Sequence, residues 1–227
     1  MKKLPLLLIM GFAVIIGMSS PSMALNIGIG ATGWYADWRF ESSEGNTNFD
    51  AAPLYGPVIS LGFSREWSLS GVFLYGKFDQ SDKGNGPGKI TRYDSDTTLN
   101  YSIARYVSLF LGFKYMGYDF SEGEHAGYGP GLGLSFTAPL ADNLFLLGNV
   151  SGLYIWGHHD DQGGDYDYTE PGANGGVSLA YNISSTVIAL GVRAQRFVTR
   201  PQESSGSARL THTFYGVTLS AVYSFTL

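Results

Sequence analysis

The last nine residues, LSAVYSFTL, alternate between two kinds of side chain, with Val222 as the one exception. Every odd position from 219 to 227 is apolar or aromatic, and serine or threonine occupies 220, 224 and 226 between them. Successive side chains of a strand point to opposite faces, so this segment predicts a β-strand with one apolar and one polar face. A closed barrel accommodates such a last strand by pairing it with the first, which leaves no free sheet edge.

The first 24 residues predict a secretory signal peptide. Lys2 and Lys3 form a positive start, 4–18 is an apolar run, and Ser22-Met23-Ala24 places small residues where a signal peptidase reads them. The run is shorter than the roughly 20 residues that a membrane-spanning helix needs. We therefore expect cleavage after Ala24, with an uncleaved anchor as the alternative, and one domain over 25–227.

Composition narrows the class of protein further. No later stretch is apolar over 18 residues, which argues against a helical membrane protein. Charged residues make up only 15% of the chain, below the roughly 25% of soluble domains, and aromatic residues make up another 15%. There is no cysteine to form a disulfide, and the net charge of −5 argues against a nucleic-acid partner.

Alternating segments recur along the rest of the chain. Most are 11 to 15 residues long, which suits tilted strands that cross a membrane. Their apolar faces are expected to meet lipid, and their small or charged faces the interior. The predicted fold is all-β: a transmembrane antiparallel up-and-down barrel of about ten strands, with eight or twelve as alternatives. The predicted strands are 26–40, 54–64, 67–78, 90–101, 106–119, 128–138, 144–157, 171–182, 186–199 and 211–227.

Short and long connections alternate between these segments, as in successive antiparallel hairpins. This arrangement predicts one barrel end with short turns and one with long connections, and places both termini at the short-turn, periplasmic end. The short connections are 65–66, 102–105, 139–143 and 183–185; the long ones are 41–53, 79–89, 120–127, 158–170 and 200–210.

Aromatic residues cluster near both sets of strand ends, as expected for belts at the two membrane interfaces. The predicted short-turn belt is Trp67, Tyr101, Tyr106, Phe145, Tyr181, Tyr223 and Phe225. The predicted belt at the other end is Trp34, Tyr35, Trp38, Tyr55, Tyr75, Tyr118, Tyr128, Tyr154, Trp156 and Phe197.

With these features, the chain resembles the small outer-membrane β-barrel proteins of Gram-negative bacteria. The terminal Tyr223-Ser224-Phe225-Thr226-Leu227 is similar to the signal read by the barrel assembly machinery, although those proteins usually end in Phe. The resemblance implies a bacterial outer-membrane location, contact with membrane lipid and lipopolysaccharide, and assembly through Tyr223, Phe225 and Leu227. It implies no particular activity.

Two sets of residues are candidates for function. The first is a polar cluster expected in the lumen, either as an ion-paired plug or as the lining of a narrow solute path: Arg92, Asp94, Asp96, Lys114 and Arg193. The second, on the predicted 158–170 loop, is either a solvated surface or a site for a divalent cation or surface ligand: His158, His159, Asp160, Asp161, Asp165 and Asp167.

The four histidines, His125, His158, His159 and His212, are all expected in or beside outer loops. An acyl-transfer or proteolytic site needs a nucleophile and a base held together. Only His125 and His212 lie near a strand end with hydroxyls in reach, and no recognisable motif surrounds either. We therefore expect a non-enzymatic barrel that displays acidic loops for interaction or envelope integrity, without cofactor or metal. A narrow channel is the first alternative, and a lipid A-modifying or proteolytic enzyme the second.

Overall fold

The computed structural model describes residues 25–42, 45–80, 88–120, 123–161, 164–202 and 209–227. The predicted signal peptide, 1–24, lies outside the described residues. None of the described residues forms a helix of the length and apolarity that crossing a membrane requires.

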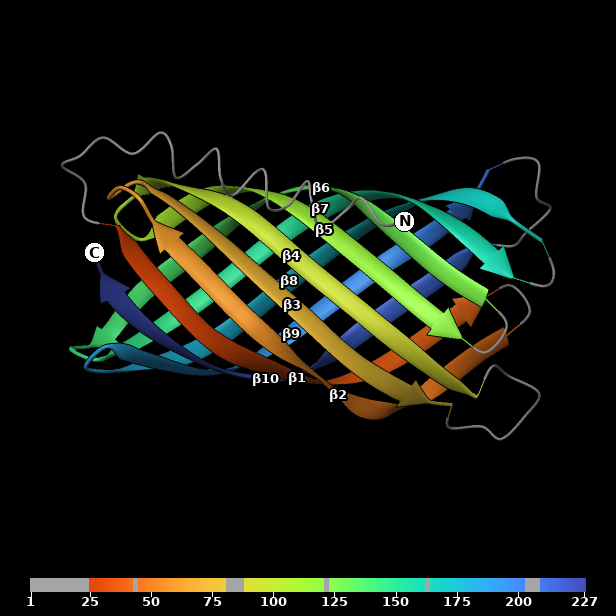
Figure 1. Ribbon diagram of the computed structural model, residues 1–227, viewed down its shortest axis with the longest axis horizontal. Coiled ribbons are helices and arrows are strands. Elements are labelled where there is room, and N and C mark those ends of the chain that lie inside the picture. Colours follow the sequence, from red (N-terminus) through yellow and green to blue (C-terminus); the bar gives the residue numbers. More distant parts are fainter. Residues whose placement is uncertain (1–24, 43–44, 81–87, 121–122, 162–163, 203–208) are drawn as a thin grey trace.

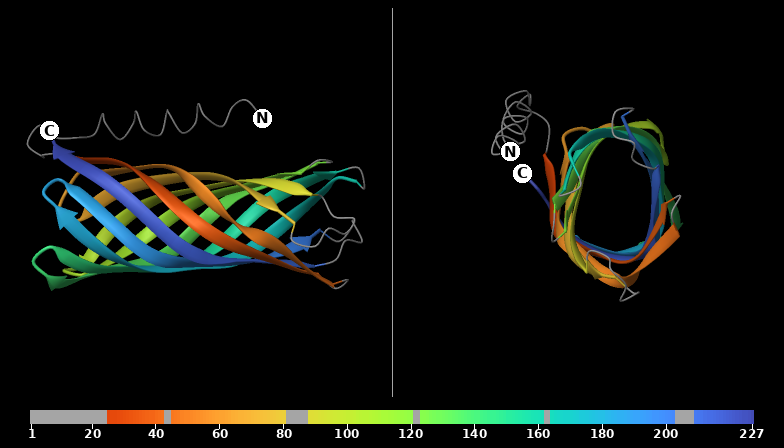
Figure 2. Two further views of the ribbon diagram at one scale, coloured as in Figure 1. Left: turned by 90° about the horizontal axis from the view of Figure 1, so that it is seen from below. Right: turned by 90° about the vertical axis from the view of Figure 1, so that its right-hand side faces the viewer.

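Ten antiparallel strands form one closed barrel, in which each strand pairs with its sequence neighbours and β1 pairs with β10 (Figures 1 and 2). The predicted fold class is confirmed. The strands are β1 (Asn26–Ser42), β2 (Gly45–Gly62), β3 (Trp67–Asp79), β4 (Lys89–Ala104), β5 (Val107–Phe120), β6 (Gly123–Ala141), β7 (Leu144–Asp161), β8 (Tyr166–Ile183), β9 (Thr186–Pro201) and β10 (Leu210–Thr226).

The last strand closes the barrel along its whole length. Its register against β1 runs from Asn26 opposite Thr226 to Glu41 opposite Thr211. The backbone N–H of Leu227 also donates to the carbonyl of Leu25 at 2.9 Å. The start of β1 and the end of β10 therefore lie at the same end of the barrel, together with the short turns (Figure 2).

The strands run further toward the long-connection end than the sequence predicts. Most of the predicted loop 41–53 is strand. β1 continues to Ser42 and β2 begins at Gly45, and only 43–44 lie outside the described residues. Likewise, only 162–165 separate β7 from β8, so most of the predicted 158–170 loop is strand. These extensions lack an apolar outer face, and the alternation used to recognise strands is absent there.

A bulge interrupts the β1–β2 pairing near this end. Ala36 pairs with Ala52 and Trp38 pairs with Phe49, so two residues of β2 lie opposite one residue of β1. An extra residue of this kind bends the strand and turns side chains to new directions. The extra residue lies on β2, and β1 keeps an unbroken register against β10 from Asn26 to Glu41.

The interior has three layers along the barrel axis. Small polar residues line the short-turn half, where the Ser70 and Thr98 hydroxyls are 2.7 Å apart. Charged residues occupy the middle, around Lys114. Toward the long-connection end the interior is an aromatic core, which contains Trp34, Trp38, Phe49, Phe78, Tyr118, Phe197 and Phe214.

Candidate functional site

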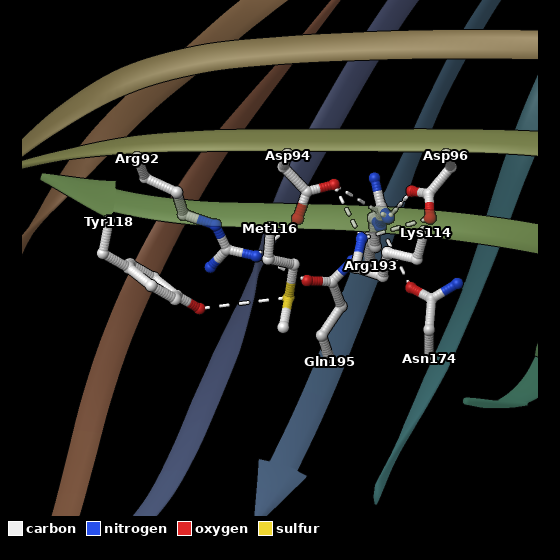
Figure 3. A network of polar contacts seen from close by, with 9 residues as sticks. All are labelled: Arg92, Asp94, Asp96, Lys114, Met116, Tyr118, Asn174, Arg193 and Gln195. Carbon is white, nitrogen blue, oxygen red and sulfur yellow. Dashed lines mark hydrogen bonds and ion pairs between the residues drawn. The ribbon is translucent and has the colours of Figure 1, made fainter. Parts of the chain in front are cut away.

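The middle layer is a network of charged side chains that spans the lumen (Figure 3). Alternate residues of β4 point inward, which places Arg92, Asp94 and Asp96 in one row. Lys114 Nζ from β5 lies 2.8 Å from Asp94 Oδ1 and 3.1 Å from Asp96 Oδ1. Arg193 reaches from β9, five strands away around the barrel, and its Nη2 lies 2.5 Å from Asp96 Oδ2. The network therefore joins opposite walls.

Two amides complete the network. Arg92 Nη2 donates to Asp94 Oδ2 at 2.5 Å and to Gln195 Oε1 at 2.7 Å. Arg193 Nε donates to Asn174 Oδ1 on β8 at 3.1 Å. All five residues of the predicted polar cluster thus converge in one place. Asn174 was missed by sequence reasoning, because a single amide among glycines gives no signal of its own.

Burial within the network is graded along the axis. The side chains of Arg92, Asp94 and Lys114 are 0–1% exposed, whereas those of Asp96 and Arg193, nearer the short turns, are 23% and 16% exposed. Charges with so little water contact need partners at hydrogen-bond distance. Each of these side chains has at least one, although Arg92 bonds only through Nη2 and its Nε and Nη1 have no hydrogen-bond partner. The network is therefore buried on its long-connection side and keeps some contact with water on its short-turn side.

Aromatic rings close the lumen beyond the charged layer. The Trp38 ring stacks on Phe49, Tyr118 and Phe214, with centroid distances of 4.0, 5.4 and 5.2 Å. These rings come from four strands, so the stack crosses the interior. The Arg92 guanidinium lies 3.5 Å from the centre of the Phe214 ring and links the two layers through a cation–π contact.

All four histidines lie on strands, beside the outer connections and not in them: His125 on β6, His158 and His159 on β7, and His212 on β10. The side chains of His125 and His212 are buried in the lumen, which the sequence did not predict. His125 stacks on Tyr168 at 4.0 Å, and its Nδ1 lies 3.3 Å from Nδ1 of His159. The inward position follows from strand alternation, since the ladder continues past the predicted strand ends.

Buried Glu170 also lies inside, although the sequence placed it in a loop. It accepts a hydrogen bond from the Thr199 hydroxyl at 2.9 Å, and its Oε1 is 3.9 Å from His212 Nε2. The hydroxyl therefore contacts the carboxylate and not the imidazole, and neither ring nitrogen of His212 has a hydrogen-bond partner. This geometry lacks the base-to-nucleophile bond that an activated hydroxyl requires.

The second predicted site occupies the ends of two strands. His158 to Asp161 belong to β7 and Asp167 to β8, while Asp165 precedes β8. His158 Nδ1 lies 2.9 Å from Asp167 Oδ1, and both side chains are more than half exposed. His159 instead joins His125 inside. Among the described residues, no group of three or more acidic or histidine side chains is arranged to hold a metal ion.

The predicted aromatic belts are partly wrong. Tyr35, Tyr55, Tyr128, Tyr154 and Trp156 are exposed on the outer surface. Four members predicted for the same belt are instead buried inside the barrel: Trp34, Trp38, Tyr118 and Phe197. On β1 the apolar face therefore changes from outward to inward, because the interior at this level is packed with rings rather than lined with small residues.

The predicted assembly residues lie on the outer face of β10. Tyr223 and Phe225 are exposed and pair with Ile29 and Ile27 of β1, and Leu227 is 73% exposed. Their side chains thus continue the apolar outer surface of the barrel across its closing seam.

The fold and the filled lumen define a class: a closed up-and-down barrel of the kind found in bacterial outer membranes. The chain is similar to the outer membrane protease OmpT from Escherichia coli at 12% identity and a TM-score of 0.52, over 91% of this chain and 98% of that one. It is also similar to the translocator domain of the autotransporter NalP from Neisseria meningitidis (12% identity, TM-score 0.45, 93% and 92% covered).

A third similar structure is the Neisserial surface protein A, at 12% identity and a TM-score of 0.41 over 85% of this chain and 96% of that chain. At these identities the likeness shows the fold alone. No family model matches the chain, and no curated protein matches it.

Proposed function

We propose that this protein is a non-conducting, integral barrel of the bacterial outer membrane that presents an acidic outer edge to binding partners. The observation that supports this proposal is the filled interior. Arg193 joins the charged layer across the lumen, and the ring stack around Trp38 lies next to that layer on the long-connection side. Barrels with open aqueous channels use 16–18 strands, and this one has ten.

The outer surface supports insertion into a membrane. Large apolar side chains are exposed along the strands, among them Leu111, Leu132, Leu190 and Leu219, each more than half exposed. A soluble protein does not leave so continuous an apolar surface in water. With the short turns, the start of β1 and the end of β10 in the periplasm, the long connections face outside.

The acidic edge lies over β5–β8. Beyond Tyr128 and Trp156 the outer face carries exposed carboxylates from four adjacent strands. These are Asp119, Glu124, Asp160 and Asp167. The strands β5–β8 contain one lysine or arginine, Lys114, and it points into the lumen. This side of the barrel therefore favours cationic partners.

Planar bilayer recording tests the closed lumen. The purified protein is expected to insert without discrete conductance steps at neutral pH. A variant with Trp38→Ala, Phe214→Ala and Arg193→Ala removes groups from both layers and is expected to conduct. Single-channel steps from the wild-type protein would contradict the proposal and favour the channel alternative.

The interaction role is tested in vesicles of neutral phosphatidylcholine, with a fluorescent lysine-rich peptide as probe. Glu124→Gln, Asp160→Asn and Asp167→Asn together are expected to lower peptide binding several-fold at low salt. The matched control neutralises three acids elsewhere: Asp37→Asn, Glu41→Gln and Asp79→Asn. Equal binding by the two triple variants would contradict the assignment of the acidic edge.

A further inference from the structure

Two histidines face one another inside the barrel at its long-connection end. His125 of β6 and His159 of β7 stand directly opposite each other in the ladder between these strands. Side chains in this position start about 4.5–5.5 Å apart at Cβ, so two imidazoles can both reach an atom placed between them. The pair lies close to the strand ends, since β6 begins at Gly123 and β7 ends at Asp161.

The distance between the two rings fits a shared metal ion. Nδ1 of His125 lies 3.3 Å from Nδ1 of His159. Hydrogen bonds from N–H groups usually span about 2.7–3.2 Å, so this contact is long for a hydrogen bond. Two nitrogens that bind one tetrahedral zinc ion, each at about 2.0–2.1 Å, are about 3.3–3.4 Å apart. The right angles of octahedral or square-planar coordination would bring them to about 2.8–3.0 Å.

Aromatic rings hold both imidazoles in place. The His125 ring stacks on Tyr168, with 4.0 Å between the ring centres and 8° between the ring planes. The His159 ring lies 4.7 Å from the Tyr166 ring and 5.6 Å from the Phe120 ring. Side chains that are already packed lose little freedom when they bind an ion, which favours binding. His125 is 6% exposed and His159 is half-buried, so an ion has access from the side of His159.

The charges of the two strands also favour a cation. Glu124 and Asp160, the neighbours of the two histidines in the chain, stand opposite each other on the outer face and are exposed. β6 and β7 contain no lysine or arginine. The two carboxylates therefore raise the local concentration of cations at this end of β6 and β7.

We propose that His125 and His159 bind a zinc ion through their Nδ1 atoms at the long-connection end of the lumen. Most zinc sites have three or four protein ligands. Here the protein supplies two, so two positions of the tetrahedron remain for water or for a donor group of an external molecule. His212 is not a ligand, because neither of its ring nitrogens makes a hydrogen bond. The site is separate from the acidic outer edge, since its ligands point into the lumen.

Isothermal titration calorimetry tests the site, with zinc chloride added to the EDTA-treated barrel in detergent. The wild-type protein is expected to bind a single zinc ion. Loss of an outer partner of a metal ligand weakens metal binding about 10–100-fold, so loss of a ligand in His125→Gln or His159→Gln should weaken it at least about tenfold. The matched control His212→Gln removes a buried imidazole from the same lumen and is expected to bind zinc as wild type does.

A second control separates this site from the outer surface. His158→Gln with Asp167→Asn removes the exposed pair on the outer face of β7 and β8 and should leave zinc binding unchanged. The proposal is overturned if this variant loses zinc while His125→Gln keeps it, if both ligand variants bind as wild type does, or if the wild-type protein binds no zinc. Heat-modifiable gel mobility shows separately that each variant is a folded barrel.

A measurement on the wild-type protein alone needs no variant to fold. Diethyl pyrocarbonate reacts with a free lone pair of imidazole, and a metal on Nδ1 leaves the proton on Nε2, so no lone pair remains. Zinc should therefore slow the modification of His159 several-fold, followed by mass spectrometry of peptides, and should not slow that of exposed His158. Equal rates at His159 with and without zinc would overturn the proposal.

Discussion

At the scale of single residues, Asp94 holds the charged layer together. It is 1% exposed and lies within hydrogen-bond distance of Arg92 on one oxygen and Lys114 on the other. Both cations are themselves fully buried. Removing this carboxylate leaves two desolvated positive charges next to each other, whereas an exposed ion pair has water to replace its partner.

We predict that Asp94→Asn lowers the free energy of unfolding by about 3–5 kcal/mol, the usual cost of breaking a buried pair. The comparison is Asp79→Asn, which removes the exposed partner of Lys89 and is expected to cost about 0–1 kcal/mol. Urea unfolding in lipid vesicles, followed by tryptophan fluorescence, measures both. Equal losses would show that the charged layer is hydrated.

The two buried histidines predict a pH dependence. His125 and His212 lie on the long-connection side of Tyr128 and Tyr35, beyond the membrane-spanning part of the strands. Burial, followed by the repulsion of His212 and His159, holds the pKa of His125 well below its usual range. Burial, followed by the repulsion of Arg92, lowers the pKa of His212 to about 3.

The unfolded chain therefore takes up protons below about pH 6.5 that the folded barrel does not. Each histidine then lowers the free energy of unfolding by about 1.4 kcal/mol per pH unit on acidification. We expect the free energy of unfolding to fall less between pH 7 and pH 5 in a variant with His125→Gln and His212→Gln than in the wild-type protein. The control His158→Gln, at an exposed position bonded to Asp167, should keep the full loss. A double variant with wild-type pH dependence would contradict this assignment.

At the scale of the strands, small residues make room for the rings of the aromatic core. Tyr168 of β8 lies against Gly157 of β7 and Gly127 of β6, where an added Cβ would overlap the phenol ring or approach its oxygen closely. The same ring stacks on His125. Strands β6, β7 and β8 therefore pack at this level only because two positions carry no side chain.

We predict that Gly157→Ala lowers the free energy of unfolding by about 1–3 kcal/mol, through displacement of Tyr168. Gly152→Ala is the control on the same strand, since a Cβ there has nothing within 4 Å. Unfolding midpoints in vesicles measure the two. An equal loss of stability at both positions would show that the effect comes from replacing any glycine of this strand and not from displacing the Tyr168 ring.

At the scale of the whole molecule, the closing seam between β1 and β10 determines whether the chain becomes a barrel. On the outer face Phe225 stands opposite Ile27 and Tyr223 opposite Ile29. Ser224, between them, faces the interior beside Gly28 and Ser60. The seam thus has an outer side that meets lipid and an inner side that meets small polar residues.

We predict that Phe225→Asp reduces the amount of heat-modifiable, membrane-inserted barrel several-fold, because a charge on the lipid face opposes insertion. Ser224→Asp places the same charge on the inner face and is expected to assemble nearly as wild type. Quantifying folded protein in the outer-membrane fraction distinguishes them. Poor assembly of both variants would show that the seam tolerates no charge on either side.

The barrel and its ten strands follow from the sequence, because within the bilayer each strand must be apolar outside and small or polar inside. That contrast is visible along β5, where Leu109, Leu111 and Phe113 alternate with inward residues. The charged row Arg92, Asp94 and Asp96 is predictable for the same reason: a charge on a membrane strand must point inward.

The aromatic core at the long-connection end of the interior is decided by the tertiary structure alone. Beyond the bilayer the outer face meets water and becomes polar, as at Asp37, Arg39 and Arg196, while rings such as Trp38 turn inward. A period of two identifies a strand but not which of its faces is inside. Only closure of the sheet brings Trp38, Phe214 and His212 together from strands at opposite ends of the chain, and so decides that the lumen is filled.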